Sequence, residues 1–332
     1  MCGILGVVHR DEVDRQAIGD QLLATLGHRG PDSTGVYTDR NVQFGHTRLS
    51  IIDLTAAGHQ PMTSDNGRYV VTYNGEIYNY LEIRALLKTK GMQFNSQSDT
   101  EVILAAYEYW GSDCVKHFRG PFAFVIWDTD TKIVFLARDA CGEKPLFYKL
   151  ESDRLSFASE LKGLIPLLRT KPDLNPASVD MYLHYQFVPE PHTLLMGVQK
   201  LPAGCTLMLS IHDWDAKLVR YWSVETVAES KPAIHKSNKM VDEIGLAVEE
   251  AVKLTLRSDV PVGIALSGGI DSGAIAVLAQ RNYPEPMHAF CVGYPGRPKY
   301  DERAQARGLA ESLGMIVHEV ELPVDSLSLI HI

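Results

Sequence analysis

The last third of the chain alternates between short apolar segments and helical segments, and this order constrains the fold more than any other feature. The expected strands cover 260–266, 287–292 and 315–322, and the expected helices cover 240–256, 273–281 and 302–313. A strand, a crossover helix and a second strand in succession pack as parallel neighbours of one sheet. The pattern therefore predicts an α/β domain built on a parallel sheet.

The first two-thirds of the chain differ, because short strands outnumber helices there. Runs of β-branched and aromatic residues predict strands at 3–8, 35–37, 42–49, 69–73, 122–127, 133–137 and 155–157. Apolar residues at helical spacing predict helices at 14–26, 80–88 and 100–109. This mixture favours sheets covered by helices. The polar segment 223–239, which contains a proline and no apolar period, is typical of a linker.

Composition limits the classes of partner. The 332 residues are 45% hydrophobic and carry a formal net charge of −9, so we expect no basic surface for nucleic acid or for an anionic membrane. No apolar run approaches the roughly 20 residues of a membrane span. The five cysteines are scattered without a Cys-x-x-Cys pair, which argues against a disulfide framework or a zinc site and favours the reducing cytoplasm. Four of them are expected to be small buried hydrophobes, namely Cys114, Cys141, Cys205 and Cys291.

A glycine-rich loop follows the apolar strand at 260–266. Residues Ser267 to Ser272 read Ser-Gly-Gly-Ile-Asp-Ser and open an alanine-rich helix. A tight Gly-Gly turn points several backbone N–H groups into one concavity, and the helix dipole adds positive potential, which is typical of a phosphate site. The loop lacks the lysine of a Walker A motif and the Gly-x-Gly-x-x-Gly spacing of a dinucleotide fold. A turn that merely joins strand to helix is the alternative, but the two serines and Asp271 favour phosphate binding.

The second residue of the chain is a cysteine. If Met1 is removed, as a small second residue permits, Cys2 carries both a thiol and a free α-amino group. A thiol with a pKa near 8.5 and an amine with a pKa of about 7.7 to 8.0 can exchange a proton directly or through one water. Cys2 would then combine a nucleophile and its base.

Polar residues at the ends of other elements fit an amide-hydrolysing cysteine. Asn74 and Gly75 can supply two donors to a tetrahedral oxyanion, and Arg48 can bind the carboxylate of a free amino acid. Glu76 and Asp99 can bind its ammonium group. Each has an ordinary alternative: Asn-Gly is the commonest hairpin turn, Asp99 suits a helix N-cap, and Arg48 suits a solvated surface charge.

Together these residues resemble two known domains. Cys2, Arg48, Asn74-Gly75 and the segment 28–35 (His-Arg-Gly-Pro-Asp-Ser-Thr-Gly) resemble the class II glutamine amidotransferase domain, an N-terminal-nucleophile hydrolase. The loop at 267–272 resembles the PP-loop of ATP pyrophosphatases. A glutamine amidotransferase domain followed by a PP-loop domain resembles the family of glutamine-hydrolysing asparagine synthetases, also called asparagine synthetase B. The resemblance extends over nearly the whole chain, from Cys2 to about Leu322, and includes residues 290–296.

The resemblance implies the fold, the domains and the site residues. It implies an α+β N-terminal-nucleophile αββα sandwich at 2–215, followed at 216–332 by part of an α/β parallel-sheet domain of the adenine nucleotide α-hydrolase-like type. The implied catalytic residues are Cys2, which forms a thioester, and the oxyanion donors Asn74 and Gly75. The implied glutamine-binding residues are Arg48, Leu49, Ser50, Ile51, Ile52, Asn74, Gly75, Glu76 and Asp99. The implied ATP-binding residues are Leu266, Ser267, Gly268, Gly269, Asp271, Ser272 and Val292.

The implied reaction couples two sites. Ammonia released from glutamine would pass to the second site, where ATP and Mg²⁺ activate aspartate as β-aspartyl-AMP. The partners implied are glutamine, aspartate and ATP, with neither nucleic acid nor a membrane, and a homodimer is a further expectation. No residue is assigned as a metal ligand.

The end of the chain departs from the family. A second loop, Ser-Gly-x-Gly-x-Asp-Glu, and a helical lobe that complete the ATP and aspartate sites are expected in the family and do not occur here. We therefore expect a truncated or frameshifted product, the last few residues of which are foreign to it, that retains only glutaminase activity and binds ATP weakly or not at all.

Several alternatives remain open. The chain could be another PP-loop amidotransferase with a different acceptor, or a non-catalytic nucleotide-binding remnant. Glucosamine-6-phosphate synthase and the purine-pathway amidophosphoribosyltransferase share the first domain but not the PP-loop, and a β-lactam synthetase should lack the cysteine.

Overall fold

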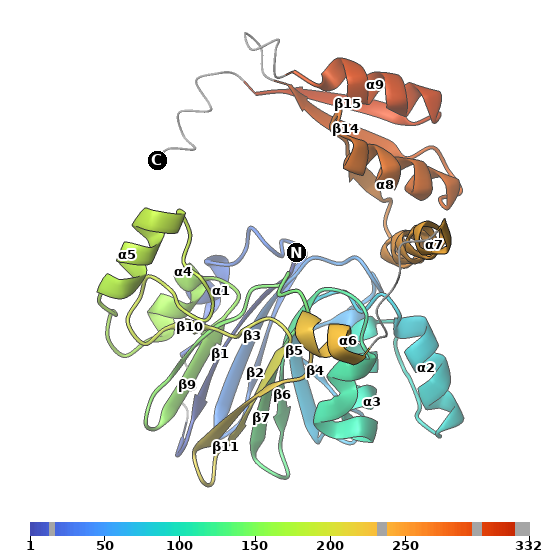
Figure 1. Ribbon diagram of the computed structural model, residues 1–332. Coiled ribbons are helices and arrows are strands. Elements are labelled where there is room, and N and C mark those ends of the chain that lie inside the picture. Colours follow the sequence, from blue (N-terminus) through green and yellow to red (C-terminus); the bar gives the residue numbers. More distant parts are fainter. Residues whose placement is uncertain (13–16, 231–237, 294–300, 323–332) are drawn as a thin grey trace. The chain divides into compact units, whose positions relative to one another are not determined.

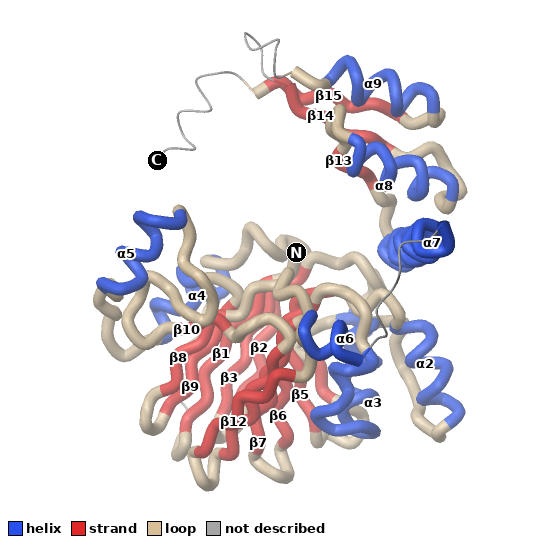
Figure 2. The backbone as a smooth tube through the Cα atoms, in the orientation of Figure 1, coloured by secondary structure: helices blue, strands red, loops and turns tan. Residues whose placement is uncertain are grey.

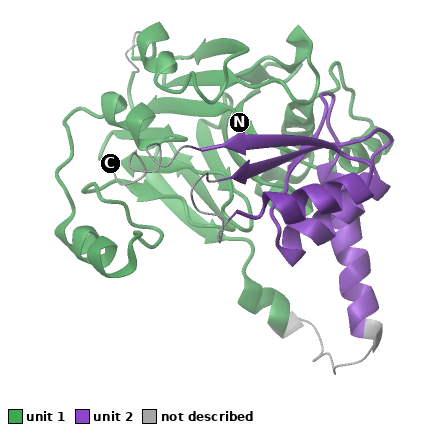
Figure 3. Cartoon of the chain, turned by 90° about the horizontal axis from the view of Figure 1, so that it is seen from above, with its two compact units in different colours: residues 1–232 green, residues 233–332 purple. Residues whose placement is uncertain are grey.

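The computed structural model describes residues 1–12, 17–230, 238–293 and 301–322, and the chain forms two compact units. Unit 1 covers residues 1–232 and unit 2 covers residues 233–332 (Figure 3). Each unit has its own sheets and its own hydrophobic core.

Unit 1 contains two six-stranded sheets in which neighbouring strands are antiparallel (Figures 1 and 2). The first sheet has the spatial order β10 (Gln199–Lys200), β8 (Phe147–Leu150), β9 (Arg154–Ala158), β1 (Gly3–His9), β3 (Val42–Arg48), β2 (Ser33–Thr38). The second has the order β12 (Asp215–Arg220), β11 (Cys205–Ser210), β7 (Ile133–Arg138), β6 (Phe122–Asp128), β5 (Tyr69–Gly75), β4 (Met62–Thr63).

Helices lie on the outer faces of both sheets. The α-helices of unit 1 are α1 (Asp20–Ala24), α2 (Tyr80–Thr89), α3 (Asp99–Trp110), α4 (Leu161–Leu164), α5 (Pro176–Tyr185) and α6 (Val224–Ser230). Three 3-10 helices accompany them, η1 (Ala56–Gly58), η2 (Gly111–His117) and η3 (Ile165–Leu167).

The alternation of side chains along the strands produces four layers. Ile4 and Val8 of β1 share one buried cluster with Val70 of β5 and Trp127 of β6, so this cluster fills the space between the sheets. The intervening residues of β1 pack outward in a cluster with α1 and α4, and the outward residues of β5 pack against α3. The strands read as nearly continuous apolar runs because both faces are covered. This architecture is the expected αββα sandwich.

Unit 2 contains a three-stranded parallel sheet, as expected. Its elements are α7 (Asn238–Thr255), β13 (Gly263–Ala265), α8 (Ile270–Arg281), β14 (His288–Gly293), α9 (Arg303–Ser312) and β15 (Ile316–Glu321). Alanines of α8 and α9 pack on Ala289 and Cys291 of β14, which lets the helices approach the sheet closely. Side chains that alternate with these, such as Phe290 and Val292, are exposed.

Four expectations differ from the structure. The helix expected at 14–26 is reduced to α1, since it begins after Gly19, and 13–16 lie outside the described residues. The segment expected as a linker at 223–239 contains α6, whose N-terminus is capped by the Ser223 hydroxyl accepting the Thr226 N–H at 3.2 Å. Cys141 is exposed rather than buried, because it lies in a surface turn. The units divide at 232 and not at 215, because β12 pairs with β11 and so belongs to unit 1.

No helix in the described ranges has the length and apolar character needed to cross a membrane. The expected terminal segment 323–332 and the end of the segment 290–296 lie outside those ranges.

Candidate active site

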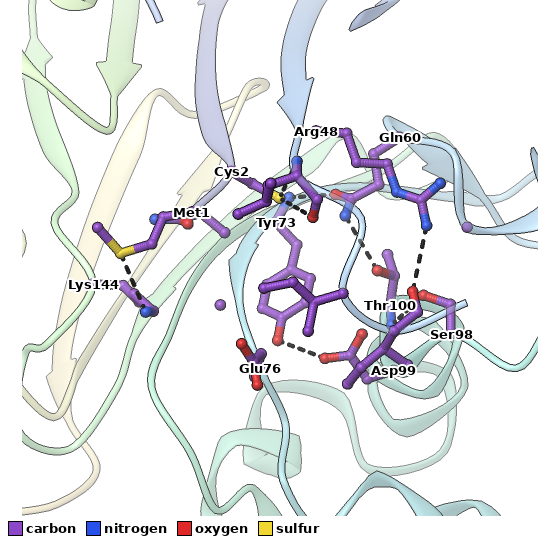
Figure 4. A pocket seen from close by; sticks show the side chains of 16 residues that line it. Met1, Cys2, Arg48, Gln60, Tyr73, Glu76, Ser98, Asp99, Thr100 and Lys144 are labelled. Carbon is purple, nitrogen blue, oxygen red and sulfur yellow. Dashed lines mark hydrogen bonds between the residues drawn. The ribbon is translucent and has the colours of Figure 1, made fainter. Parts of the chain in front are cut away.

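The ends of three strands and the start of one helix meet at a pocket of unit 1. Cys2 directly precedes β1, and the antiparallel register of β1 with β3, in which Gly3 faces Thr47, places Cys2 beside Arg48. Asn74 and Gly75 end β5, and Asp99 begins α3. The pocket is partly open to solvent and has a cavity volume of about 50 Å³ (Figure 4). Its walls are formed by Met1, Cys2, Arg48, Leu49, Ile51, Ile52, Gly58, Gln60, Tyr73, Asn74, Gly75, Glu76, Ser98, Asp99, Thr100 and Lys144.

The structure thus brings together eight of the nine expected glutamine-binding residues, and Cys2 with them. Ser50 is the exception, because it does not line the pocket. Its backbone N–H instead donates to the Asp32 carboxylate at 2.7 Å. That bond ties the loop after β3 to the segment that begins β2.

The Cys2 thiol is held by the backbone of Leu49. The Leu49 N–H donates to Sγ at 3.4 Å, and Sγ lies 3.6 Å from the Leu49 carbonyl oxygen. Burial raises the pKa of this thiol, while the Leu49 N–H acts in the opposite direction. The Arg29 guanidinium fixes the backbone of the same residue by donating to the Cys2 carbonyl at 2.8 Å.

Asn74 carries a buried amide without hydrogen-bond partners. Its side chain is fully buried, yet neither Oδ1 nor Nδ2 forms a hydrogen bond. An unpaired buried amide costs roughly 1–3 kcal/mol, so this side chain lowers the stability of unit 1. Asn74 and Gly75 pair with Ala123 and Phe122 of β6, so they belong to a ladder and not to a hairpin turn.

Arg48 is a buried cation, not a solvated surface charge. Only 7% of it is exposed, and its guanidinium donates to the carbonyls of Thr55 (3.0 Å), Ile52 (3.4 Å) and Asp53. Among the described residues no carboxylate forms an ion pair with it. Gly58 leaves the space that the guanidinium fills, because a Cβ there would lie 2.1 Å from Nη2.

Two carboxylates face the same pocket. Asp99 accepts the Tyr73 hydroxyl at 2.8 Å and the Ile77 N–H at 3.0 Å, and burial raises the pKa of its carboxyl. Burial and the nearby Asp99 raise the pKa of Glu76 to about 7. The helix N-cap is Ser98, which accepts the Thr100 N–H, so Asp99 does not have the capping role considered for it.

Three residues of the site carry no clear pattern in the sequence. Gln60 accepts the Tyr73 N–H at 2.8 Å and donates to the Thr100 hydroxyl at 3.2 Å, which links β5 to α3. Lys144 lines the pocket from the turn after β7. His46 is buried under the site with Nε2 3.0 Å from the Tyr73 carbonyl, and burial lowers its pKa to about 3. Only contact across distant segments reveals these roles.

The glycine loop of unit 2 is shaped by its two serines. The Ser267 and Ser272 hydroxyls lie 2.8 Å apart, the Ser272 oxygen also accepts the Ser267 N–H at 3.3 Å, and the Gly269 N–H donates to Ser267 at 3.2 Å. The Gly268 N–H donates to the Glu302 carboxylate at 3.2 Å, so this loop already binds one anionic group. Leu266 is buried, whereas Val292 is half-exposed at the same carboxyl edge of the sheet.

No group of three or more His, Cys, Asp and Glu in the part of the chain that the structure describes is arranged to hold a metal ion.

The layered fold and the pocket beside residue 2 define a class, the N-terminal-nucleophile amidotransferases. Residues 1–222 match the family model described as a glutamine amidotransferase domain, and residues 243–330 match that described as asparagine synthase. The chain belongs to the glutamine amidotransferase domain family, joined to an asparagine synthase region. The expected family combination is thereby confirmed.

Named relatives agree with this assignment, and a solved structure shares the fold. The chain is 38% identical over 319 residues to asparagine synthetase [glutamine-hydrolyzing] 1 of Bacillus subtilis, covering 95% of this chain and 49% of the relative. It is 35% identical to asparagine synthetase [glutamine-hydrolyzing] 3 of the same organism, covering 90% and 49%. It thus spans about half the length of these relatives. A solved structure described as the allosteric regulatory enzyme of purine biosynthesis shares the fold, with a TM-score of 0.50, 16% identity and coverage of 96% of this chain and 80% of that one.

Proposed function

We propose that unit 1 hydrolyses glutamine at Cys2 and releases ammonia. The observation that carries the proposal is the buried, unpaired amide of Asn74 in the pocket that Cys2 lines. A donor kept free of partners is suited to an oxyanion that exists only during the reaction.

The reaction begins once Met1 has been removed. The Cys2 α-amine takes the thiol proton, and the thiolate attacks the side-chain amide carbon of glutamine. Asn74 Nδ2 and the Gly75 N–H donate to the oxygen of the tetrahedral intermediate. When the intermediate collapses, the protonated amine gives its proton to the leaving nitrogen, and ammonia departs from a γ-glutamyl thioester. Water then attacks the thioester, which yields glutamate and regenerates the thiol.

Charge complementarity accounts for the choice of a free amino acid. Arg48 is buried, forms no ion pair with a carboxylate in the described part of the chain, and would bind the α-carboxylate of glutamine. Glu76 and Asp99 would bind its ammonium group, and the Leu49, Ile51 and Ile52 segment would form the adjoining wall.

We further infer that the ammonia amidates aspartate in an ATP-dependent reaction through β-aspartyl-AMP, an inference supported by the similarity to relatives named glutamine-hydrolyzing asparagine synthetases. Leu266, Ser267, Gly268, Gly269, Asp271, Ser272 and Val292 would contact ATP. The Gly268 N–H, which now binds a carboxylate, is suited to a phosphate oxygen. Mg²⁺ would enter with the phosphates, since it usually retains waters and few protein ligands.

The test is a comparison of two cysteine variants. Cys2→Ala should lower glutamine hydrolysis by several orders of magnitude, because the covalent nucleophile is lost. Cys141→Ala removes an exposed thiol outside the pocket and should retain activity. Ammonia release measures both, and hydroxylamine should trap the γ-glutamyl group of the parent enzyme only if the thioester forms. Activity of Cys2→Ala within tenfold of the parent would refute the assignment.

A further inference from the structure

Lys144 presents a cation to the pocket without a carboxylate partner. It lines the pocket, and its Nζ lies 3.4 Å from Met1 Sδ, the one side-chain contact that the structure gives it among the described residues. Figure 4 shows Lys144 and Arg48 on opposite sides of the pocket, with Glu76 below and between them. Once Met1 is removed, this ammonium group faces the substrate space directly.

Two buried charged residues fix the backbone of Lys144. The Lys144 N–H donates to Asp139 Oδ2 at 3.0 Å, and its carbonyl accepts from Arg138 Nε at 2.8 Å. Asp139 and Arg138 are only 2% and 5% exposed. Because both partners are buried, these two hydrogen bonds fix the position of the Lys144 backbone relative to the core.

The same carboxylate connects Lys144 to the oxyanion donors. Asp139 Oδ2 also accepts the N–H of Phe122 at 3.2 Å, and Phe122 pairs with Gly75 across the ladder of β5 and β6. The backbone of Lys144 is therefore held at a fixed position relative to the end of β5, which carries Asn74 and Gly75.

The charges of the pocket explain what this cation does. Glutamine is a zwitterion and adds no net charge, so a pocket that holds it should be nearly neutral. Arg48 balances one of the carboxylates Glu76 and Asp99, and the second would remain in excess without Lys144. Two like charges close together favour protonation of one of them.

We propose that Lys144 is a positioning residue for glutamine binding, which acts by keeping Glu76 ionised beside Asp99. This inference rests on the proposed glutaminase function. The titratable and charged groups that face Glu76 are Asp99 from α3, Tyr73 from β5, Lys144 from the turn after β7, and the amino group at the start of the chain. Of these, Lys144 and the amino group favour the charged form of Glu76, while burial and Asp99 oppose it.

The sign of the pH effect follows from this arrangement. Burial and Asp99 raise the pKa of Glu76, and this carboxylate binds the ammonium group when ionised, so the KM for glutamine should rise as the pH falls and Glu76 becomes protonated. Loss of Lys144 should move this rise to higher pH by about one unit, which corresponds to about 1.4 kcal/mol of electrostatic interaction.

The experiment measures kcat and KM of the full chain between pH 6 and pH 9 for four proteins. Lys144→Met should raise KM several-fold at pH 7 and leave kcat within about threefold. It should also move the acid limb of the KM profile, the region where KM rises as the pH falls, to higher pH. Lys144→Arg, which keeps the charge, should resemble the parent. Lys149→Met is the matched control, because Lys149 pairs with Glu151 at 3.3 Å and does not line the pocket. If Lys144→Met fails to fold by circular dichroism, Lys144→Gln takes its place.

A double variant separates this role from others. In a Glu76→Gln background, the change Lys144→Met should cause no further shift of the acid limb. A full shift in that background, an unchanged acid limb in Lys144→Met, or a fall in kcat alone would each overturn the inference. A parent enzyme without glutaminase activity, or activity that survives Cys2→Ala, would instead overturn the proposed function itself.

Discussion

The pocket of unit 1 and the glycine loop of unit 2 both lie where a strand ends near the start of a helix, but they are prepared for a ligand differently. In the pocket, Asn74 is fully buried and is placed by the ladder of β5 with β6. Asp99 is 5% exposed at the start of α3, where its carboxylate accepts the Tyr73 hydroxyl and the Ile77 N–H. In the loop, Ile270 is 89% exposed and the conformation depends on the serine pair 267 and 272. The conformation of the pocket therefore depends on the folding of the whole unit, whereas the conformation of the loop depends mainly on hydrogen bonds between residues close in the sequence.

This difference has an energetic meaning. A buried cation, a buried carboxylate such as Asp99 and an unpaired buried amide each disfavour folding when no ligand is bound. Unit 1 retains all three in one place and compensates them with the surrounding core. The loop has no comparable free-energy cost, because its backbone N–H groups can donate to its own serines, to Glu302 or to water.

After Cys2, the largest effect expected within the pocket comes from Asn74. Asn74→Ala should lower kcat by about 10²–10³-fold and change KM little, because its amide acts on the oxyanion alone. Asn41→Ala is a structural control, since the Asn41 amide donates to three backbone carbonyls at 2.7–3.2 Å. It should lower the melting temperature and retain kcat. An Asn74→Ala enzyme changed only in KM would exclude the oxyanion role.

The next effect tests the position of Arg48 without removing its charge. Gly58→Ala introduces a Cβ 2.1 Å from the guanidinium and should displace it, which raises the KM for glutamine about tenfold, since small misplacements weaken charge-assisted contacts strongly. Gly245→Ala adds a methyl group in open space on α7 and should leave KM unchanged. Steady-state kinetics compares the two. Equal KM values for both variants would show that the guanidinium position is not limiting.

The pH dependence of stability tests the burial of His46. Its pKa is about 3 in the folded chain and about 6.5 when unfolded. Between these values the unfolded chain binds one more proton, so stability is complete above pH 6.5 and decreases toward acid by about 1.4 kcal/mol per pH unit. His46→Gln should remove this component while its amide still donates to Tyr73.

Urea unfolding between pH 4 and pH 7 measures the His46 effect. All four tryptophans, Trp110, Trp127, Trp214 and Trp222, belong to unit 1, so their fluorescence reports that unit separately. Equal pH slopes for the parent and His46→Gln would contradict a buried neutral imidazole.

The smallest effect on glutamine hydrolysis is expected from the loop. Ser272→Ala removes the hydroxyl that contacts Ser267, and hydrogen exchange of residues 266–273 should become faster. Glutaminase activity should stay within about twofold, because no residue of the loop lines the pocket. A tenfold change in hydrolysis would show that the two regions are energetically coupled and that the contrast between them is too simple.

The sequence reveals features that repeat locally and hides those that depend on distant contacts. The strands β1, β3, β5 and β6 and the parallel sheet were predictable, because apolar periodicity records burial directly. The strands β4, β8, β10, β11 and β12 were not predicted. The strands β4 and β10 have only two residues each, and β12 is half polar and mostly exposed, so these three carry little periodicity. Cys2, Arg48 and Asn74 were identifiable through a resemblance, whereas their common pocket depends on strand register.

Residues that hold the site in place were harder to foresee. Gln60, His46 and Asp139 act through backbone groups more than a dozen residues away, and no spacing rule connects them with their partners. Lys144 was equally hidden, as a single lysine in a turn is ordinary. Such positioning roles follow from three-dimensional contact alone.

Met1 lines the pocket next to Lys144, and this has a practical consequence for preparing the protein. Any residue that precedes Cys2 converts the proposed base into an amide and occupies a wall of the substrate space. An affinity tag therefore belongs at the other end of the chain. Specific activity would then report how completely an aminopeptidase has matured each batch, and intact-mass spectrometry should follow it in proportion.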